Sequence, residues 1–433
     1  MNKFLLSLAA SLLLARVVFA QVPEAGYSRR VLVPAKPEEA GMSSERLSRL
    51  DRTLEQYIDQ GRIPGAVVLV ARHGKIIHYK GLGMKDGEKK EPMQKDDIFR
   101  IASQTKAITS VAVMMLYEEG RFLLDDPVAK YIPEFRKPVL LDKFNEKDSS
   151  YTTRPAQGEV TIRHLLTHTS GIGYGFTNPK LTGAVYAKAG VPDLIGAAGM
   201  TLKDRMKVLA GLPLLHNPGE KFTYGLSVDM LGYLVEVLSG QNLADFFRQR
   251  IFEPLAMRDT YFYLPLSKGH RLVMLHGENQ EGKAEKLPER RRGLPRDFPL
   301  APEGSYFSGG GGLSSTALDY AVFLQMMLNG GEYNGQRLLS RKTVDLMLTN
   351  QIDQLSLGPD KFGLGFSVAT DKSSARFPVS VGTFAWGGAF GTTYWADPRE
   401  EIIALLLTQV YPSRAVGEAQ DKFRVLVYQA IVD

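Results

Sequence analysis

The stretch "FRIASQTKAIT", from Phe99 to Thr109, places a serine and a lysine three positions apart. It joins a β-like run to an apolar segment that predicts a helix from about Gln104 to Glu119. A serine hydroxyl is a poor nucleophile at neutral pH, so it needs a neighbouring base and donors for the oxyanion formed on attack. One helical turn would bring Lys106 within reach of the Ser103 hydroxyl, which favours nucleophilic catalysis.

The start of this helix has further features that suit such a reaction. It offers free backbone N–H groups and the positive end of the helix dipole. Apolar residues on most of its faces predict burial nearly all round, which would favour the neutral amine of Lys106 that accepts a proton. The alternative is that Ser103 only caps the helix and Lys106 is an ordinary lysine. The pair is the only Ser-x-x-Lys in the chain.

Two later stretches carry further candidates. "PGEKFTYGLSVDMLG" puts Tyr224 in a loop flanked by Gly and Pro, just before a predicted helix. "FAWGGAFGTTYWADP" places Trp386, Gly387 and Gly388 on a strand whose glycines leave room beside a site. Taken alone, Tyr224 could be a packed core tyrosine and Trp386 an aromatic residue of the sheet.

Together with "SQTK" and "TIRHLLTHTSGI", these stretches resemble the serine β-lactamase and penicillin-binding-protein superfamily, in particular class C β-lactamases and the related family VIII carboxylesterases. The resemblance extends from the helix at Leu47 to the last helix of the chain. It implies the β-lactamase/transpeptidase-like fold and acyl-enzyme chemistry without a cofactor or a metal.

The resemblance also implies a role for each candidate residue. Ser103 would be the acylated nucleophile, and Lys106 would help to deprotonate it. Tyr224 would shuttle the proton to the leaving group and then activate the deacylating water. The oxyanion donors would be the backbone N–H groups of Ser103 and Ala389, which follows the substrate-binding run of Trp386, Gly387 and Gly388. Whether Lys106 or Tyr224 is the resting base stays open.

Two departures from the family pattern bear on the substrate. In β-lactamases the third motif begins with a lysine that pairs with the substrate carboxylate, and here Trp386 stands in that place. The asparagine two residues after the tyrosine is replaced by Leu226, for which Ser227 is a candidate substitute. Because an indole offers one N–H donor and an apolar face, the change favours uncharged esters.

We therefore predict a serine carboxylesterase with weak or no β-lactamase activity, acting on a small-molecule ester. The alternatives are a D-amino-acid peptidase or amidase, a class C-like β-lactamase of the same fold, and a non-catalytic penicillin-binding-like protein. The acyl and alcohol groups of the substrate and the oligomeric state are not predicted.

Three further sequence patterns bear on function. His164 and His168 have the spacing of a helical zinc pair, but no Glu follows the first and no third ligand is evident, so we expect a structural role. The strip "SGGGGLSS", 308–315, lacks the Gly-Lys-Ser/Thr of a phosphate loop and predicts a tight turn that could face the cleft. No Gly-x-Ser-x-Gly occurs, so an α/β-hydrolase elbow has no candidate.

The order of predicted elements indicates an α/β fold of the α+β type. Strand-like runs lie near both ends of the chain, with helical pieces between them. This arrangement predicts one mainly antiparallel sheet built from both chain ends and flanked by helices, with an inserted helical domain. The expected parts are 21–126 and 349–433 for the α/β domain and 127–348 for the helical domain. Leu264 to Pro302 is the candidate for a long irregular loop near the pocket.

The first twenty residues have the layout of a secretory signal. Lys3 precedes an apolar run from Phe4 to Leu14, and small residues end at Ala20, before Gln21. We expect removal of 1–20 and a periplasmic or secreted mature chain. The alternative is an uncleaved anchor, although the apolar run is shorter than the ~20 residues of a bilayer span. No later stretch is long and apolar enough to cross a membrane.

The amino-acid composition excludes several classes of chemistry and of binding partner. The 433 residues contain no Cys, which excludes disulfides and thiolate chemistry. The formal charge of +6 falls to +4 once Lys3 and Arg16 leave with the signal, and basic residues are scattered among acidic ones. This pattern does not indicate a nucleic-acid partner.

Overall fold

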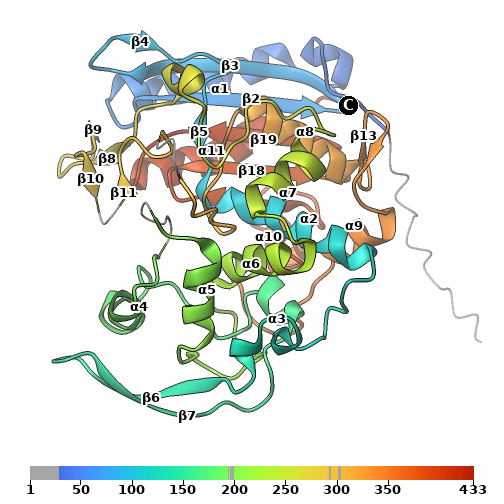
Figure 1. Ribbon diagram of the computed structural model, residues 1–433. Helices are drawn as coiled ribbons and strands as arrows, with labels where there is room; N and C mark the ends of the chain where they lie inside the picture. The colour runs from blue at the N-terminus through green and yellow to red at the C-terminus, as the bar shows by residue number, and fades with distance from the viewer. Residues whose placement is uncertain (1–28, 194, 196–198, 292–293, 301–303) are drawn as a thin grey trace, which may run out of the picture.

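The computed structural model describes residues 29–193, 195, 199–291, 294–300 and 304–433 (Figure 1). The predicted signal segment, 1–20, lies outside the described residues. Among those residues, no helix has both the length and the apolar character that a membrane span requires.

A nine-stranded sheet contains strands from both ends of the chain. Its main path runs β1-β3-β2-β19-β18-β17-β16-β15, and β4 pairs with β3. Only β1 pairs in parallel. The strands are β1 (Val33–Pro34), β2 (Gly65–Arg72), β3 (Lys75–Asp86), β4 (Glu91–Pro92), β15 (Lys361–Phe362), β16 (Ser367–Val368), β17 (Phe384–Gly388), β18 (Thr392–Asp397) and β19 (Ile402–Leu407). The predicted fold class is confirmed.

The turn between β2 and β3 follows from its residues. His73 and Gly74 have φ values of 54° and 73°. Two successive positive φ angles are what a tight hairpin needs to match the twist of its strands. Glycine supplies the second at no steric cost, so the chain can reverse within these two residues.

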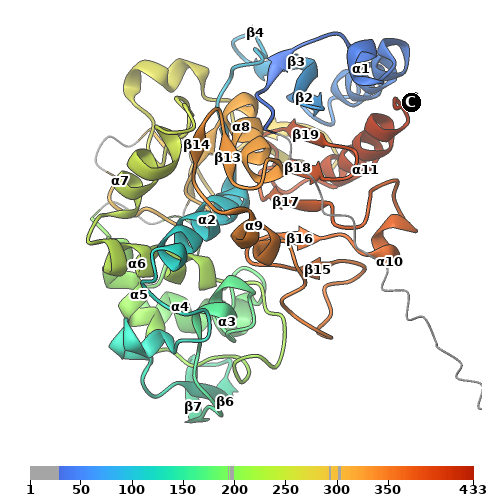
Figure 2. The same cartoon turned by 90° about the vertical axis from the view of Figure 1, so that its right-hand side faces the viewer.

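Helices cover both faces of the sheet (Figure 2). α1 (Ser44–Asp59) and α11 (Arg414–Tyr428) pack on one face, which we call the outer face. α2 (Thr105–Glu118) and α8 (Ala317–Leu328) lie on the other, the inner face. β2 contributes side chains to the hydrophobic cores on both faces, because alternate residues of a strand point to opposite faces. Val68 and Val70 belong to the core on the outer face, and Val67 and Leu69 to the core on the inner face.

The region between the two halves of the sheet is mainly helical. It contains α3 (Ile162–Leu166), α4 (Ala184–Ala189), α5 (Leu202–Ala210), α6 (Ser227–Ser239), α7 (Leu243–Phe247) and α9 (Arg341–Met347). It also contains a hairpin that the sequence did not predict, β6 (Val139–Asn145) with β7 (Ser150–Pro155). Every residue of β7 is exposed, so this strand lacks the apolar face that reveals a strand in a sequence. The division of the chain at 126 and 348 stays a prediction.

The segment from Leu264 to Pro302 has more structure than the irregular loop we expected. It forms a 3-10 helix, Leu266–Arg271, and a hairpin of β8 (His276–Glu278) and β9 (Ala284–Lys286). Arg100, which is 2% exposed, donates hydrogen bonds to the carbonyls of Val273, Arg296 and Phe298. Burial lowers the pKa of Arg100 to about 9. A buried guanidinium therefore fastens this segment to the strand that leads to Ser103.

Candidate active site

Ser103 sits where a strand turns sharply into a helix. β5 (Phe99–Arg100) pairs with β12 (Ser314–Ser315), a 3-10 turn follows at Ala102–Gln104, and α2 begins at Thr105. Ala102 has φ 43°, a left-handed conformation that is uncommon for a residue with a Cβ. Strain of this kind persists where the surroundings hold it and is often found at functional sites.

Lys106 is 2% exposed and stands at the centre of a polar cluster. Its Nζ lies 3.1 Å from Ser103 Oγ, 2.9 Å from Tyr174 Oη and 2.5 Å from the Gly310 carbonyl oxygen. Two protonation states satisfy this geometry. An ammonium donates all three bonds, and a neutral amine donates to Tyr174 and Gly310 while it accepts the proton of Ser103. Lys106 can therefore deliver a proton to Ser103 or take one from it.

The carbonyl of Gly310 is held in place by a buried carboxylate. Asp229 Oδ1 accepts hydrogen bonds from Ser308 Oγ at 2.5 Å and from the Gly310 N–H at 3.2 Å. Burial raises the pKa of Asp229, although the Ser308 bond and the charge of Lys106 oppose the shift. A Cβ on Gly310 would lie 2.3 Å from Asp229 Oδ2, so only glycine fits there. The glycine strip is thus a tight turn that faces Lys106.

Tyr224 lies in the loop before α6, close to Lys106. The Lys106 Nζ is 4.7 Å from the centre of its ring. Its Oη accepts a hydrogen bond from Trp386 Nε1 at 3.3 Å. In the described part of the chain, Ser103 Oγ is hydrogen bonded to Lys106 and not to Tyr224. Of the two candidate bases, Lys106 is therefore the one in contact with the nucleophile.

Trp386 directs its one donor into the protein rather than toward a substrate. Its ring centre lies 5.5 Å from that of Tyr224 and 5.3 Å from that of Phe362. The indole N–H is used by Tyr224, so the half-buried ring offers a ligand only its carbon edge and face. The proposed substitute Ser227 is fully buried and bonded to Ser170 Oγ at 2.9 Å, so it presents no hydroxyl to a substrate.

β17 brings its last residues next to the nucleophile. A Cβ on Gly388 would lie 2.3 Å from the Ile101 carbonyl oxygen, whereas one on Gly387 would first meet an atom at 3.1 Å. Glycine at 388 therefore permits the close approach of β17 to the turn before Ser103. Ala389 follows β17 and packs against the cluster that contains Ala102. Its N–H has no acceptor among the described residues, which leaves this donor free for an oxyanion.

Two members of the cluster were missed by sequence reasoning. Tyr174 is 68 positions from Lys106, and nothing in "SGIGYGF" marks it. Burial and the nearby Asp229 raise the pKa of Tyr174 well above its ordinary value, so it is a neutral phenol. Asp229 lies within the quoted Tyr224 stretch, but its inward position could only be recognised once α6 was placed.

The histidine pair does not form a metal site. α3 ends at Leu166, and His168 has φ 56°, so the two rings do not share a helical face. The His164 Nδ1 accepts the N–H of Thr161 at 3.2 Å at the start of α3. No group of three or more His, Cys, Asp or Glu with metal-binding geometry occurs in the described ranges.

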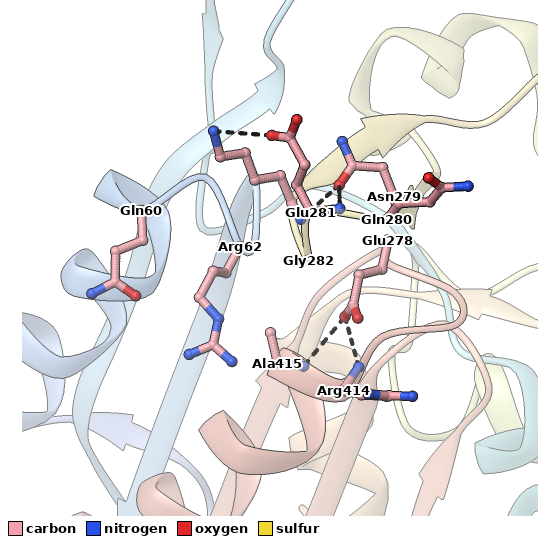
Figure 3. Close-up of a pocket in the computed structure, with 10 residues that line it drawn as sticks. Gln60, Arg62, Glu278, Asn279, Gln280, Glu281, Gly282, Arg414 and Ala415 are labelled. Atoms are coloured by element: carbon pink, nitrogen blue, oxygen red, sulfur yellow. Dashed lines mark hydrogen bonds and ion pairs between the residues drawn. The ribbon is translucent and has the colours of Figure 1, made fainter.

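Two hollows of the described structure lie away from Ser103. One of about 680 Å³ lies beside the end of α1 and the start of α11, where Glu278 accepts the N–H groups of Arg414 at 2.7 Å and Ala415 at 3.4 Å (Figure 3). Its carboxylate therefore caps α11. Another, of about 650 Å³, has aromatic walls that include Phe262 and Phe307.

Comparison with known proteins indicates the same family that the sequence motifs indicate. The family model described as beta-lactamase matches residues 50–429. The chain belongs to the β-lactamase family. This confirms the predicted place in the serine β-lactamase and penicillin-binding-protein superfamily.

Proteins similar to this chain include two bacterial proteins and one protein of solved structure. Protein Rv1367c of Mycobacterium tuberculosis is 34% identical over 85% of this chain and 91% of its own length. Esterase EstB of Burkholderia gladioli is 32% identical over 88% of this chain and 95% of its own. The structure of EstCE1, described as a hydrolase with promiscuous acyltransferase activity, covers 89% of this chain and 99% of its own at a TM-score of 0.74 and 29% identity.

Proposed function

We propose that this β-lactamase family member is a serine hydrolase that cleaves uncharged carboxylic esters through an acyl-enzyme on Ser103. The observation that carries the proposal is the contact of Lys106 Nζ with Ser103 Oγ in a buried site, with Trp386 in place of a cation. The relatives named as an esterase and a hydrolase support it.

In the acylation step, Ser103 Oγ attacks the ester carbonyl while its proton passes to the amine of Lys106. The new O–C bond yields an oxyanion that the N–H groups of Ser103 and Ala389 stabilise. The C–O bond to the alcohol then breaks, the leaving oxygen takes the proton of the Tyr224 hydroxyl, and the proton held by Lys106 replaces it. The centre of the Tyr224 ring lies 4.7 Å from Lys106 Nζ. Water then attacks the acyl carbon while one of its protons passes through Tyr224 to Lys106. The bond from the acyl carbon to Ser103 Oγ breaks, Lys106 returns the proton to Ser103, and the acid is released.

The surroundings of Trp386 favour esters over carboxylate-bearing substrates. A lysine at this position would offer an ammonium to a β-lactam or peptide carboxylate, whereas the indole N–H is already bonded to Tyr224. The rings of Trp386 and Phe362, 5.3 Å apart, give an apolar wall instead. Desolvating a carboxylate against that wall without a partner would cost binding free energy.

A substrate panel tests the proposal. The purified chain would be assayed with p-nitrophenyl esters of graded acyl length, a chromogenic cephalosporin and a D-alanyl-D-alanine peptide. We expect a higher kcat/KM for p-nitrophenyl butyrate than for the cephalosporin, and no activity of Ser103→Ala on either. A higher kcat/KM for the cephalosporin or the peptide would contradict the ester assignment.

Export of the chain is part of the proposal, because the first twenty residues have the layout of a secretory signal. Expression of the full chain in a bacterium with a periplasm should yield mature protein that begins at Gln21. N-terminal sequencing of the periplasmic fraction checks this, and intact protein that begins at Met1 in the cytoplasm would contradict it.

A further inference from the structure

His168 contacts the backbone on both sides of Tyr224. Its carbonyl oxygen accepts the N–H of Thr223 at 2.7 Å, and its Nδ1 accepts the N–H of Gly225 at 3.4 Å. His168 has a φ of 56°. In this backbone conformation, its carbonyl group and its ring both contact the loop that contains Tyr224. Two hydrogen bonds from one residue thus bracket Tyr224.

The ring of His168 also supports the phenol directly. It is 0% exposed, and its centre lies 4.7 Å from that of Tyr224. Phe222 and Phe362 each place a ring centre 5.8 Å away, edge-on. Burial lowers the pKa of His168 well below its ordinary value, and a protonated Lys106 lowers it further, so the ring is neutral.

The neutral ring has its proton on the nitrogen that lacks a partner. Because Nδ1 accepts the Gly225 N–H, Nε2 carries the hydrogen. Nε2 has no hydrogen-bond partner among the described residues. An unpaired buried N–H is unfavourable, and a phenyl ring of similar size would avoid that cost. What a histidine supplies here, and a phenylalanine does not, is the acceptor at Nδ1.

We propose that His168 is a positioning residue for Tyr224, which uses its Nδ1 and its carbonyl oxygen to hold the phenol between Lys106 and Trp386. The proposal rests on the proposed function of Tyr224 in proton transfer. A small displacement of a proton-transfer group is enough to reduce a rate by about 10²-fold, so a fixed backbone at Thr223 and Gly225 matters for catalysis.

Two variants of His168 distinguish the role of its hydrogen-bond acceptor from the role of its side-chain packing. His168→Asn keeps an acceptor at the δ position, and asparagine tolerates a positive φ better than most residues. His168→Gln differs by one CH₂, which moves the acceptor to the ε position and loses the Gly225 bond. We expect kcat for p-nitrophenyl butyrate to stay within about threefold of wild type in His168→Asn and to fall at least about tenfold in His168→Gln, with KM little changed.

A merely structural role would give a different pattern. Thermal unfolding of both variants measures whether the fold survives. His168→Phe, which keeps an aromatic ring without the acceptor, should resemble His168→Gln. Equal kcat values in His168→Asn and His168→Gln, or wild-type activity of His168→Phe, would overturn the proposal.

A double-mutant cycle supplies the closing experiment. If His168 acts through Tyr224, adding His168→Gln to Tyr224→Phe should reduce the rate little further, whereas independent effects would multiply. The cycle is measured both on ester hydrolysis and on the rate at which a fluorophosphonate labels Ser103. A wild-type chain that the fluorophosphonate labels but that hydrolyses no ester would contradict the proposed function without contradicting the role of His168. Multiplicative effects on ester hydrolysis, or a fall in the labelling rate on His168→Gln that persists in the Tyr224→Phe background, would contradict the positioning role of His168 instead.

Discussion

The two faces of the central sheet share the same strands but differ in what they bury. The outer face packs apolar side chains of α1 and α11 against the sheet, and both helices begin at serine caps, Ser43 and Ser413. The inner face buries Lys106, Asp229 and His168 beside its hydrophobic core. Burial of polar groups costs free energy unless each has a partner. The comparison indicates that the outer face mainly stabilises the fold, whereas the inner face also positions the polar groups proposed for catalysis.

Ser103→Ala should have the largest effect and should separate the two faces most clearly. Removing the attacking oxygen is expected to reduce kcat/KM for p-nitrophenyl butyrate at least about 10⁴-fold, because no acyl-enzyme forms. Since only a hydroxyl bonded to Lys106 is lost, the unfolding midpoint should change little. Steady-state kinetics and thermal unfolding of the same preparation measure both. A residual activity of more than about 1% of wild type would contradict the role.

Phe423→Ala should show the opposite behaviour on the outer face. Phe423 is 1% exposed, and its ring centre lies 5.0 Å from that of Trp395. The cavity left behind should lower the free energy of unfolding by about 3–5 kcal/mol. Urea denaturation measures this loss, and kcat at a temperature where the variant is folded should stay close to that of wild type. A variant with full stability and impaired kcat would reverse the assigned roles.

Tyr224→Phe should reduce activity less than Ser103→Ala, because Lys106 remains in contact with the nucleophile. Loss of the phenolic oxygen removes the acceptor of the Trp386 N–H and the proposed proton carrier. We expect kcat to fall about 10²-fold with the fold intact. Kinetics on esters with good and poor leaving groups would sharpen the result, since the defect should be larger for a poor one. An unchanged kcat would remove Tyr224 from the mechanism.

Asp319→Asn should change how stability depends on pH. Asp319, on the inner face, accepts the N–H of Asp259, and burial raises its pKa from 3.8 to about 6. Between these values the folded state holds a proton that the unfolded state releases, so stability falls as pH rises from about 4 to about 6. The loss amounts to at most about 3 kcal/mol, and the variant should lack it. Urea denaturation at each pH compares the two proteins.

Asp51 on α1 provides the matched control. Burial acts to raise the pKa of Asp51, but hydrogen bonds from His78 and Lys80 outweigh it and lower that pKa. Its contribution to stability is therefore present above pH 4 and lost as the pH falls. Asp51→Asn should remove a pH dependence of the opposite sign. Parallel pH profiles for wild type, Asp319→Asn and Asp51→Asn would contradict this contrast between the faces.

Helix α1 on the outer face and the contact between Ser103 and Lys106 can both be predicted from local sequence patterns. The spacing of Leu47, Leu50 and Leu54 after Ser43 predicts α1, which the structure has at Ser44–Asp59. The Ser103 and Lys106 pair was predicted because three positions along a helix bring two side chains together. Both inferences need only neighbours in the chain.

The rest of the inner face depends on contacts between distant segments. Tyr174, the Gly310 carbonyl and Lys106 meet although 68 and 204 positions separate them from the lysine. His164 and His168 have the sequence spacing of a helical zinc pair, but α3 ends at Leu166, so this spacing does not place the two rings on one helical face. A single sequence contains no signal for such meetings, because Tyr174 and Gly310 lie in loops that only the tertiary fold brings against Lys106 on α2.

Intact-mass spectrometry after exposure to a fluorophosphonate tests the central claim most directly. If the buried contact with Lys106 activates Ser103, the wild-type chain should gain the mass of one phosphonyl group. Peptide mapping should place that group on Ser103, and Ser103→Ala should gain none. A wild-type chain that stays unlabelled, or a label that Ser103→Ala still acquires, would contradict the account.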